Sequence, residues 1–134
     1  MLNFTSRTTY YLSSTPTDMR NGREGLSGII REKMQRDPYS YDEAFIFYSK
    51  DYRKVKILHY DINGFVLYQK WFDDGKFLKP RFLEAARCHK ISRETLIFII
   101  RKTKCYRIAK RNVQNVKRNV YILISPSNPV KTTF

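Results

Sequence analysis

The chain has 134 residues, the length of one ordinary domain that can bury a hydrophobic core. Hydrophobic residues make up 42% of it and aromatic residues 15%, which excludes a disordered polymer, and no apolar run approaches the roughly 20 residues that span a bilayer. The formal net charge is +14, large enough to oppose folding through self-repulsion unless counterions or a polyanion offset it.

The positive charge is concentrated in the second part of the chain. Residues 1–80 contain 13 Lys or Arg against 10 Asp or Glu, a net charge of +3. Residues 81–134 contain 13 Lys or Arg against only Glu84 and Glu94, a net charge of +11. Nucleic acid is the leading candidate partner, because basic side chains release condensed counterions when they bind phosphates, while anionic membrane and acidic proteins are alternatives. Residues 1–4 lack the regions of a signal peptide, so we expect a soluble, cytoplasmic protein with no membrane partner.

The first predicted elements are a strand and a helix. Residues 8–12 are β-branched and aromatic, which is typical of a strand. Thr17 is a plausible helix N-cap with Asp18 in the first turn, and the residues at helical spacing that should face the core are Leu26, Ile29, Ile30 and Met34. Three glycines within this segment indicate close backbone packing, or a later helix start near Arg23. Asp37-Pro38 ends the helix.

An antiparallel meander and a second helix follow. Residues 44–48, 54–60 and 65–71 have strand character, with a polar turn at residues 50–53 and a tighter turn in which Asn63-Gly64 supplies a positive φ. Residues 76–78 suggest a short further strand, and Ser92 is a candidate cap for a helix that buries Leu96, Ile99 and Ile100. We therefore predict an α+β fold: a mostly antiparallel sheet of about four strands, with one helix before the meander and one after it.

The last 30 residues are predicted to extend beyond this domain. We divide the chain into an α+β domain at residues 1–104 and a basic C-terminal extension at residues 105–134, partly disordered. Residues 120–124 form an apolar, strand-like run that should either add to a sheet or meet a partner. Residues 125–134 are expected to be a frayed tail.

A basic hairpin is the first candidate nucleic-acid site. Alternation on the strand from Lys54 directs Lys54, Lys56 and Tyr60 to one face. With cations from the turn and the next strand this makes a basic ridge suited to phosphates, composed of Lys50, Arg53, Lys54, Lys56 and Lys70. The alternative is an ordinary solvated hairpin face.

Arg20 is a second candidate. At a helix N-terminus its guanidinium and the free backbone N–H groups could hold a phosphate. The alternative, which we favour, is a helix cap together with an internal pair between Arg20 and a carboxylate, which fixes the entry of the chain into the helix.

A basic stretch from Arg101 to Arg118 is the third candidate, because it contains eight Lys or Arg residues and no acidic residue. Its proposed phosphate contacts, with little sequence preference, are Arg101, Lys104, Arg107, Lys110, Arg111, Lys117 and Arg118. A solvated charge run is the alternative, although such a surface normally mixes both signs.

Catalytic patterns are absent from the sequence. His59 and His89 lie on separate elements without a Cys or carboxylate at metal-ligand spacing, and Asp61 and Asp73-Asp74-Gly75 have the character of turns. Cys88 and Cys105 are expected to be reduced thiols. We predict no enzymatic activity, no metal and no cofactor; a metal-dependent nuclease that uses Asp61 or Asp73 is the less favoured alternative.

A set of residues between Thr15 and Pro80 carries a family resemblance. The set comprises Thr15-Pro16-Thr17-Asp18-Met19-Arg20, Gly22, Gly25-Leu26-Ser27, Asp37-Pro38, Phe45-Ile46-Phe47, Lys54-Val55-Lys56-Ile57-Leu58, Tyr60-Asp61, Gly64-Phe65-Val66-Leu67-Tyr68, Lys70, Gly75, Phe77 and Pro80. In this order and spacing it resembles the TnpB accessory proteins of insertion-sequence family sixty-six, a group of bacterial transposable elements. The resemblance covers about residues 8 to 103.

The resemblance implies a role in transposition beside a separate transposase that carries out strand transfer. Together with the charge, it predicts a non-catalytic accessory protein that binds nucleic acid, DNA of the element, mainly through phosphates. The alternative is a module that docks the transposase through residues 120–124 and exposed aromatic side chains, without contacting DNA.

Overall fold

A five-stranded sheet forms the centre of the fold in the computed structural model, which describes residues 4–101, 103–104, 121–124 and 131–133. Its strands are β1 (Thr9–Ser13), β2 (Glu43–Tyr48), β3 (Lys54–Asp61), β4 (Gly64–Trp71) and β7 (Cys88–Ile91), arranged in the order β4-β3-β2-β1-β7. β1 and β2 are parallel, with Thr9 opposite Glu43, and every other neighbouring pair is antiparallel. The predicted α+β class and mostly antiparallel sheet are confirmed, while the strand number of about four was too low because β7 was missed.

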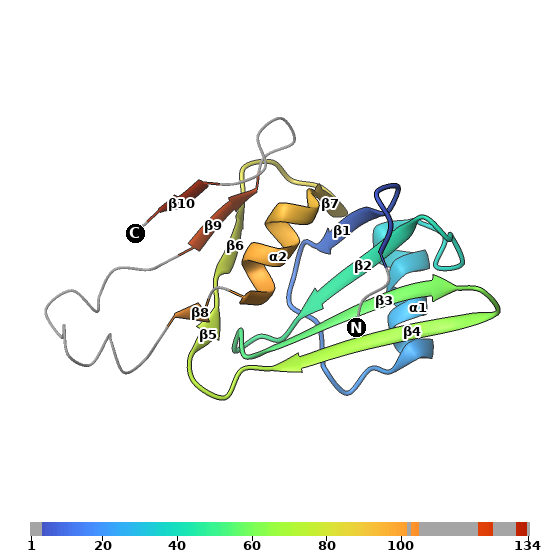
Figure 1. Cartoon of the computed structure of the whole chain (residues 1–134), viewed down its shortest axis with the longest axis horizontal. Coiled ribbons are helices and arrows are strands. Elements are labelled where there is room, and N and C mark those ends of the chain that lie inside the picture. Colours follow the sequence, from blue (N-terminus) through green and yellow to red (C-terminus); the bar gives the residue numbers. More distant parts are fainter. Residues whose placement is uncertain (1–3, 102, 105–120, 125–130, 134) are drawn as a thin grey trace, which may run out of the picture.

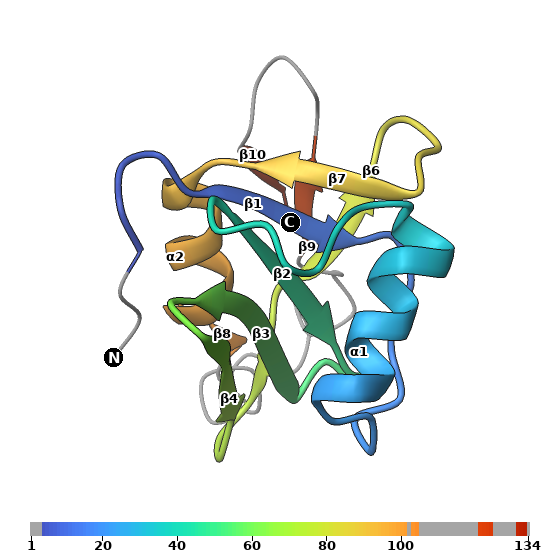
Figure 2. The same cartoon turned by 90° about the vertical axis from the view of Figure 1, so that its right-hand side faces the viewer.

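Two helical segments cover opposite faces of this sheet (Figures 1 and 2). α1 (Arg23–Ile29) continues into a π-helical turn, η1 (Ile30–Met34), and together they form the crossover that a parallel β1–β2 pair requires. α2 (Arg93–Arg101) covers the other face, and the Ser92 hydroxyl accepts a hydrogen bond from the backbone N–H of Thr95 at 3.1 Å, which confirms the predicted cap. No helix in the described part of the chain is long and apolar enough to cross a membrane.

The hydrophobic core is split by the sheet into two clusters. On the α1 face, Leu26 and Ile30 pack with Met34 against side chains of β2 and β3, namely Phe45, Phe47 and Leu58. On the α2 face, Leu96 and Ile99 belong to a larger cluster with alternate residues of β1, β2 and β3. Because both faces are covered, every residue of β2 from Ala44 to Tyr48 is buried, as in the interior strands of three-layer folds.

The start of the first helix differs from the primary expectation. Gly22 is the N-cap and α1 begins at Arg23, so Thr17 is not the cap and the alternative of a late start is confirmed. An ideal Cβ at Gly25 would lie 2.2 Å from the side-chain Oδ1 of Asn21, so close packing is present at this glycine. The helical segment ends where Gln35 adopts a left-handed φ of 55°, two residues before Asp37-Pro38.

Two small sheets adjoin α2. β5 (Lys76–Phe77) pairs with β8 (Thr103–Lys104), and β6 (Lys79–Phe82) pairs with β9 (Tyr121–Ile124), which also pairs with β10 (Lys131–Thr133). The apolar run at residues 120–124 therefore adds to a sheet, and Ile124 is buried in the same cluster as α2. β10 lies within the segment expected to be a frayed tail, so that expectation was wrong for residues 131–133. The domain division at residue 104 stays a prediction, and residues 105–120 and 125–130 lie outside the described residues.

Candidate nucleic-acid interface

One end of the central sheet brings together the β2–β3 turn, the end of β4 and the start of β5. The backbone N–H of Phe72 donates to the carbonyl of Arg53 at 2.9 Å, and that of Phe77 donates to the carbonyl of Tyr52 at 2.9 Å. These bonds hold residues 72–77 against the turn. We call this region the basic end and define it by its cations, which are Lys50, Arg53, Lys54, Lys70, Lys76, Lys79 and Arg101.

The turn itself is held by an acidic side chain. The Asp51 carboxylate accepts hydrogen bonds from the Ser49 hydroxyl at 2.6 Å and from the backbone N–H of Arg53 at 3.1 Å. The hydrogen bond from Ser49 is the largest cause of the lowered pKa of Asp51. This carboxylate therefore stays ionised, and it is engaged by hydrogen bonds within the turn. Tyr52 adopts a left-handed φ of 59°, which completes the reversal.

Three cations of this turn are available for a ligand. Lys50 and Arg53 are exposed, and Lys54 is half-buried at the start of β3. Within the described residues none of the three forms an ion pair; the Arg53 guanidinium makes one long hydrogen bond, 3.5 Å to the carbonyl of Asp73. Asp73 and Asp74 are exposed at the same end, so the local charge is mixed but predominantly positive.

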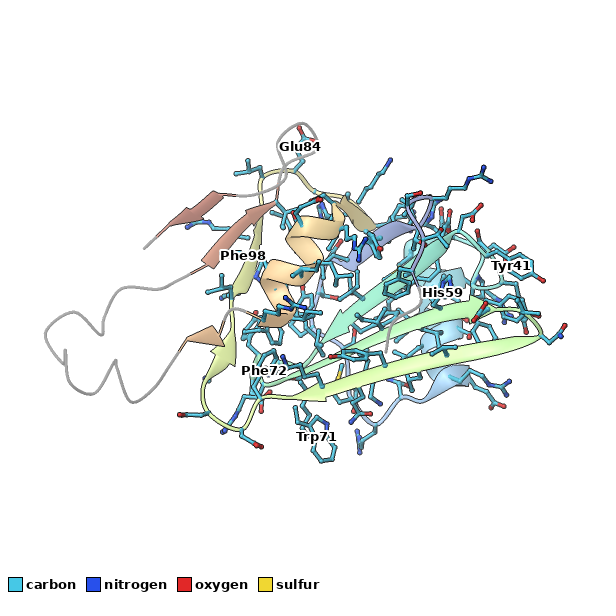
Figure 3. All side chains as sticks on the ribbon, in the orientation of Figure 1. Tyr41, His59, Trp71, Phe72, Glu84 and Phe98 are labelled. Carbon is cyan, nitrogen blue, oxygen red and sulfur yellow. The ribbon has the colours of Figure 1, made fainter. Side chains whose placement is uncertain are left out.

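Trp71 lies beside Lys54 on this end. The two residues are opposite each other in the β3–β4 register, and directly opposed residues share a sheet face. The Lys54 ammonium nitrogen is 5.6 Å from the centroid of the Trp71 ring, and the Trp71 side chain is 65% exposed. Figure 3 shows Trp71 projecting away from the sheet, whereas the next residue, Phe72, lies among the packed side chains.

An open cleft runs between the turn and the segment that precedes α1. Its volume is about 610 Å³, and the side chains that line it include Asp18, Met19, Lys50 and Lys54. The backbone N–H of Thr17 donates to the carbonyl of Tyr48 at 2.8 Å, which fixes the two walls relative to each other. The cleft thus presents two of the available lysines.

Arg20 forms an ion pair with Asp18 at this position. The guanidinium and carboxylate are 2.6 Å apart, and the hydrogen bond from Arg20 is the main cause that lowers the pKa of Asp18 to about 2. Arg20 lies three residues before the first helical residue, so it does not sit at the helix N-terminus. The ion pair of the favoured alternative is confirmed, so the charge of Arg20 is already balanced by its neighbour. The cap of that alternative was wrong, because the N-cap is Gly22 and, within the described residues, no side chain caps the helix.

Lys56 is buried and does not belong to an accessible basic ridge. Its side chain is only 5% exposed, and its ammonium donates to the carbonyls of Met19 at 2.8 Å and Asn21 at 2.9 Å. Alternation places Lys56 on the face of Lys54 as predicted, but the segment before α1 covers that face. The expectation that Lys56 lies on an accessible ridge was therefore wrong.

Lys70 lies on the other face of the sheet from Lys54, so the two lysines do not form one ridge. It is opposite Val55 in the β3–β4 register and therefore lies on the α2 face, away from Lys54. Its ammonium donates to the carbonyl of Ile100 at 2.5 Å and lies 4.9 Å from the centroid of the Phe72 ring. Lys70 thus satisfies one of the free carbonyls in the last turn of α2.

The C-terminal candidates are described only in part. Arg101 is exposed at the end of α2, and the backbone of Lys104 pairs with that of Lys76 in the β5–β8 ladder. The remaining predicted contacts, which lie outside the described residues, are Arg107, Lys110, Arg111, Lys117 and Arg118.

Three residues at the basic end were not predicted from the sequence. Lys79 places its ammonium 5.7 Å from the centroid of the Tyr52 ring, and Lys76 precedes Phe77, which bonds to the same turn. The sequence pattern places Trp71 in a strand and does not predict an exposed ring there. Its position as the last residue of an edge strand, directly before the core residue Phe72, was the available signal for an exposed aromatic ring.

The carboxylates named for a nuclease are separated. Asp61 immediately precedes the hairpin turn before β4, whereas Asp73 follows the end of β4, so the length of that strand lies between them. His59 places Nδ1 3.0 Å from the carbonyl of Glu43, and His89 stacks on Phe82 with ring centroids 3.8 Å apart. Among the residues that the structure describes, no three His, Cys, Asp or Glu side chains form a group that could hold a metal ion.

The chain is similar to one protein family and to one curated protein. The family of IS66 Orf2-like proteins matches residues 8–110. Over 75 residues the chain is 31% identical to the uncharacterized protein y4jC of Sinorhizobium fredii (strain NBRC 101917 / NGR234). That match covers 56% of this chain and 63% of the relative, so the chain spans less than two thirds of the relative's length. No solved structure matches the chain.

Proposed function

The chain belongs to the IS66 Orf2-like family of TnpB accessory proteins, and from this premise we propose that it binds nucleic acid through its basic end to assist a separate transposase. The family is associated with transposable elements and is non-catalytic. The observation that supports binding is the set of Lys50, Arg53 and Lys54, three cations without an ion-pair partner among the described residues. Such cations contact phosphates whatever the base sequence.

The size of the proposed contact follows from the number of available cations. Lys76 and Lys79 lie beside the turn. Together with Lys50, Arg53 and Lys54 they make five cations that can reach phosphates. Each phosphate neutralised on duplex DNA contributes about −0.9 to the slope of log affinity against log salt concentration. We expect a slope of about −4.5 from these five cations alone, made steeper by the C-terminal cations.

The test is binding of the purified protein to a duplex that carries the terminal repeats of the element, and to a scrambled duplex, across a salt series. The double variant Lys50→Ala with Arg53→Ala should weaken binding to both duplexes and flatten the slope by about 2. The matched control is Lys33→Ala with Lys90→Ala, which removes the same charge from exposed positions on η1 and β7. Equal slopes for the two double variants would refute the basic end as the phosphate site.

The C-terminal cations need a different test. Deletion of residues 105–134 would remove β9, which lies between β6 and β10 and contributes Ile124 to the core. Loss of binding after that deletion could therefore reflect loss of structure. Replacement by glutamine keeps the chain intact and should lower the affinity for every duplex. The residues to replace are Arg107, Lys110, Arg111, Lys117 and Arg118.

A second candidate function is docking of the transposase. Both edges of β9 are paired within its own sheet, so residues 121–124 no longer favour this role. The supporting observation is instead a hydrophobic surface around the β3–β4 hairpin turn, which we call the hairpin end. It contains four of the seven exposed large hydrophobic side chains among the described residues, namely Tyr39, Tyr41, Ile62 and Leu67. Tyrosine and arginine are frequent in binding hot spots, and the Arg31 guanidinium lies 5.6 Å from the centroid of the Tyr39 ring.

Docking and DNA binding are distinguished by their salt dependence. Tyr39→Ala with Tyr41→Ala should weaken a salt-insensitive complex with the purified transposase and leave the affinity for DNA unchanged. Lys50→Ala with Arg53→Ala should have the opposite effects. A transposase complex that is unaffected by both tyrosine substitutions would refute docking at the hairpin end.

A further inference from the structure

We propose that Trp71 stacks on an unpaired base, so that the basic end prefers single-stranded or locally opened nucleic acid to an intact duplex. This proposal rests on the proposed function, because the cations that hold the phosphates belong to the same site. It adds a ligand class, the face of a nucleobase, to a site otherwise defined by charge.

The exposure of Trp71 is the first observation. The side chain is 65% exposed at the end of an edge strand, where the chain continues directly into the buried Phe72. In the described part of the chain, the group over its ring is the Lys54 ammonium, 5.6 Å from the centroid. One face of the indole thus has a cation beside it, while most of the side chain is open to a ligand.

The setting of Trp71 is the second observation. Proteins that bind single strands combine cations that follow the phosphates with aromatic rings on which bases stack. Here Lys54 is directly opposite Trp71 on β3, and the exposed Lys50 and Arg53 lie in the turn that precedes Lys54. A base on the indole would place its phosphates within the region of these side chains. In a duplex the bases are already stacked inside the helix, so the indole has no free base to contact.

Among the residues that the structure describes, the other exposed aromatic side chains do not share this setting. Tyr39 and Tyr41 each pack against Tyr60, with ring centroids 5.2 and 5.3 Å apart, so their rings already have aromatic partners. Asp37 and Asp42 are exposed beside them in the sequence and would repel phosphates. Of the exposed rings in the described part of the chain, Trp71 is the one that combines an open face with the cations of the basic end.

The experiment uses the intrinsic fluorescence of the chain, because Trp71 is its only tryptophan. The full-length protein is titrated with a mixed-sequence single strand and with the duplex of the same sequence at one salt concentration. We expect quenching of Trp71 fluorescence by the single strand and tighter binding of the single strand than of the duplex. Trp71→Ala should weaken single-strand binding by about 5- to 150-fold, the range for loss of one stacked base, and leave duplex binding unchanged.

Two further variants test whether the loss of affinity is specific to an aromatic ring at position 71. Trp71→Phe should retain part of the single-strand affinity, and Tyr41→Ala, which removes an exposed ring at the hairpin end, should retain all of it. The salt slope should be the same for Trp71→Ala and the parent, because no charge is removed.

The outcomes separate this proposal from the proposed function. Salt-dependent binding of both ligands, with no loss in Trp71→Ala, would overturn stacking and leave phosphate binding intact. Equal losses for the single strand and the duplex would also overturn stacking, since the ring would then act on phosphate contacts alone. No binding of either ligand would refute both proposals.

Discussion

Replacing Lys56 by methionine separates the lysines that support the fold from those proposed to bind phosphate. The Lys56 side chain is buried, and its ammonium donates to the carbonyls of Met19 and Asn21. These carbonyls lie in the segment that leads into α1, so Lys56 ties β3 to the start of the crossover. Methionine keeps the length of the side chain and removes the charge and both hydrogen bonds.

The expected loss of stability follows from these two bonds. Hydrogen bonds that involve a charged group contribute about 1.5–3 kcal/mol each, so the pair contributes roughly 3–6 kcal/mol before other effects. Removal of a buried charge recovers part of its desolvation penalty. We expect Lys56→Met to lower the free energy of unfolding by about 2–4 kcal/mol, a substantial share of the 5–15 kcal/mol typical of a domain.

The assay is urea denaturation of the parent, Lys56→Met and Lys54→Met. Lys54 is two residues away on the same face, but it reaches the cleft and Trp71, so Lys54→Met should stay within about 0.5 kcal/mol of the parent. In DNA binding under folding conditions, Lys54→Met should flatten the salt slope by about 1 and Lys56→Met should leave it unchanged. Unchanged stability for Lys56→Met, or a slope that falls as it does for Lys54→Met, would refute the structural role.

Two further predictions concern α1 and His89. Gly25→Ala should lower the urea midpoint although alanine favours helices, because the new Cβ would displace the Asn21 side chain, which donates to the carbonyl of Asp18. Gly28→Ala is the control: a Cβ at Gly28 would have nothing within 4 Å, so this variant should raise the free energy of unfolding by about 0.5–1 kcal/mol. Stabilisation by both substitutions would show that packing at Gly25 is loose. Burial lowers the pKa of His89, partly opposed by Glu84, so the folded state binds its proton less readily than the unfolded state. The contribution of His89 to stability should be complete above about pH 6.5 and should decline as the pH falls below that value. His89→Phe, which can still stack on Phe82, should remove this part of the pH dependence of stability. The measurement is the urea midpoint of parent and variant between about pH 5 and 7.5. A parent and variant with parallel pH profiles would contradict the His89 prediction.

The fold was predictable where local pattern determines it. The alternating and apolar segments located β2, β3 and β4 within one or two residues, and the glycines before Leu26 indicated the late start of α1. The parallel β1–β2 pair was not predictable from local pattern, since it depends on which sheet edge the crossover reaches. β7 was missed because four residues, Cys88–Ile91, are too short to show a period.

The candidate site was predictable only in part, for a related reason. Period-2 alternation correctly placed Lys54 and Lys56 on one face, but it does not reveal what covers that face, and here the Met19–Asn21 backbone covers Lys56. Trp71 and Lys79 join the basic end through tertiary contacts with Lys54 and Tyr52, which no spacing in the sequence encodes.

The distribution of cations and exposed rings supports two separate contact regions rather than one. Lys56 and Lys70 are engaged by backbone carbonyls, so the described lysines of the predicted ridge and the basic end that remain for a ligand are Lys50, Lys54, Lys76 and Lys79. The hairpin end, where Tyr41 projects in Figure 3, lies at the opposite end of β4 from Trp71. An eight-residue strand is roughly 25 Å long, enough for a phosphate backbone at one end and a protein at the other without a steric conflict. If both proposals hold, DNA and transposase should bind the same molecule together, and competition between them would show that they share one surface.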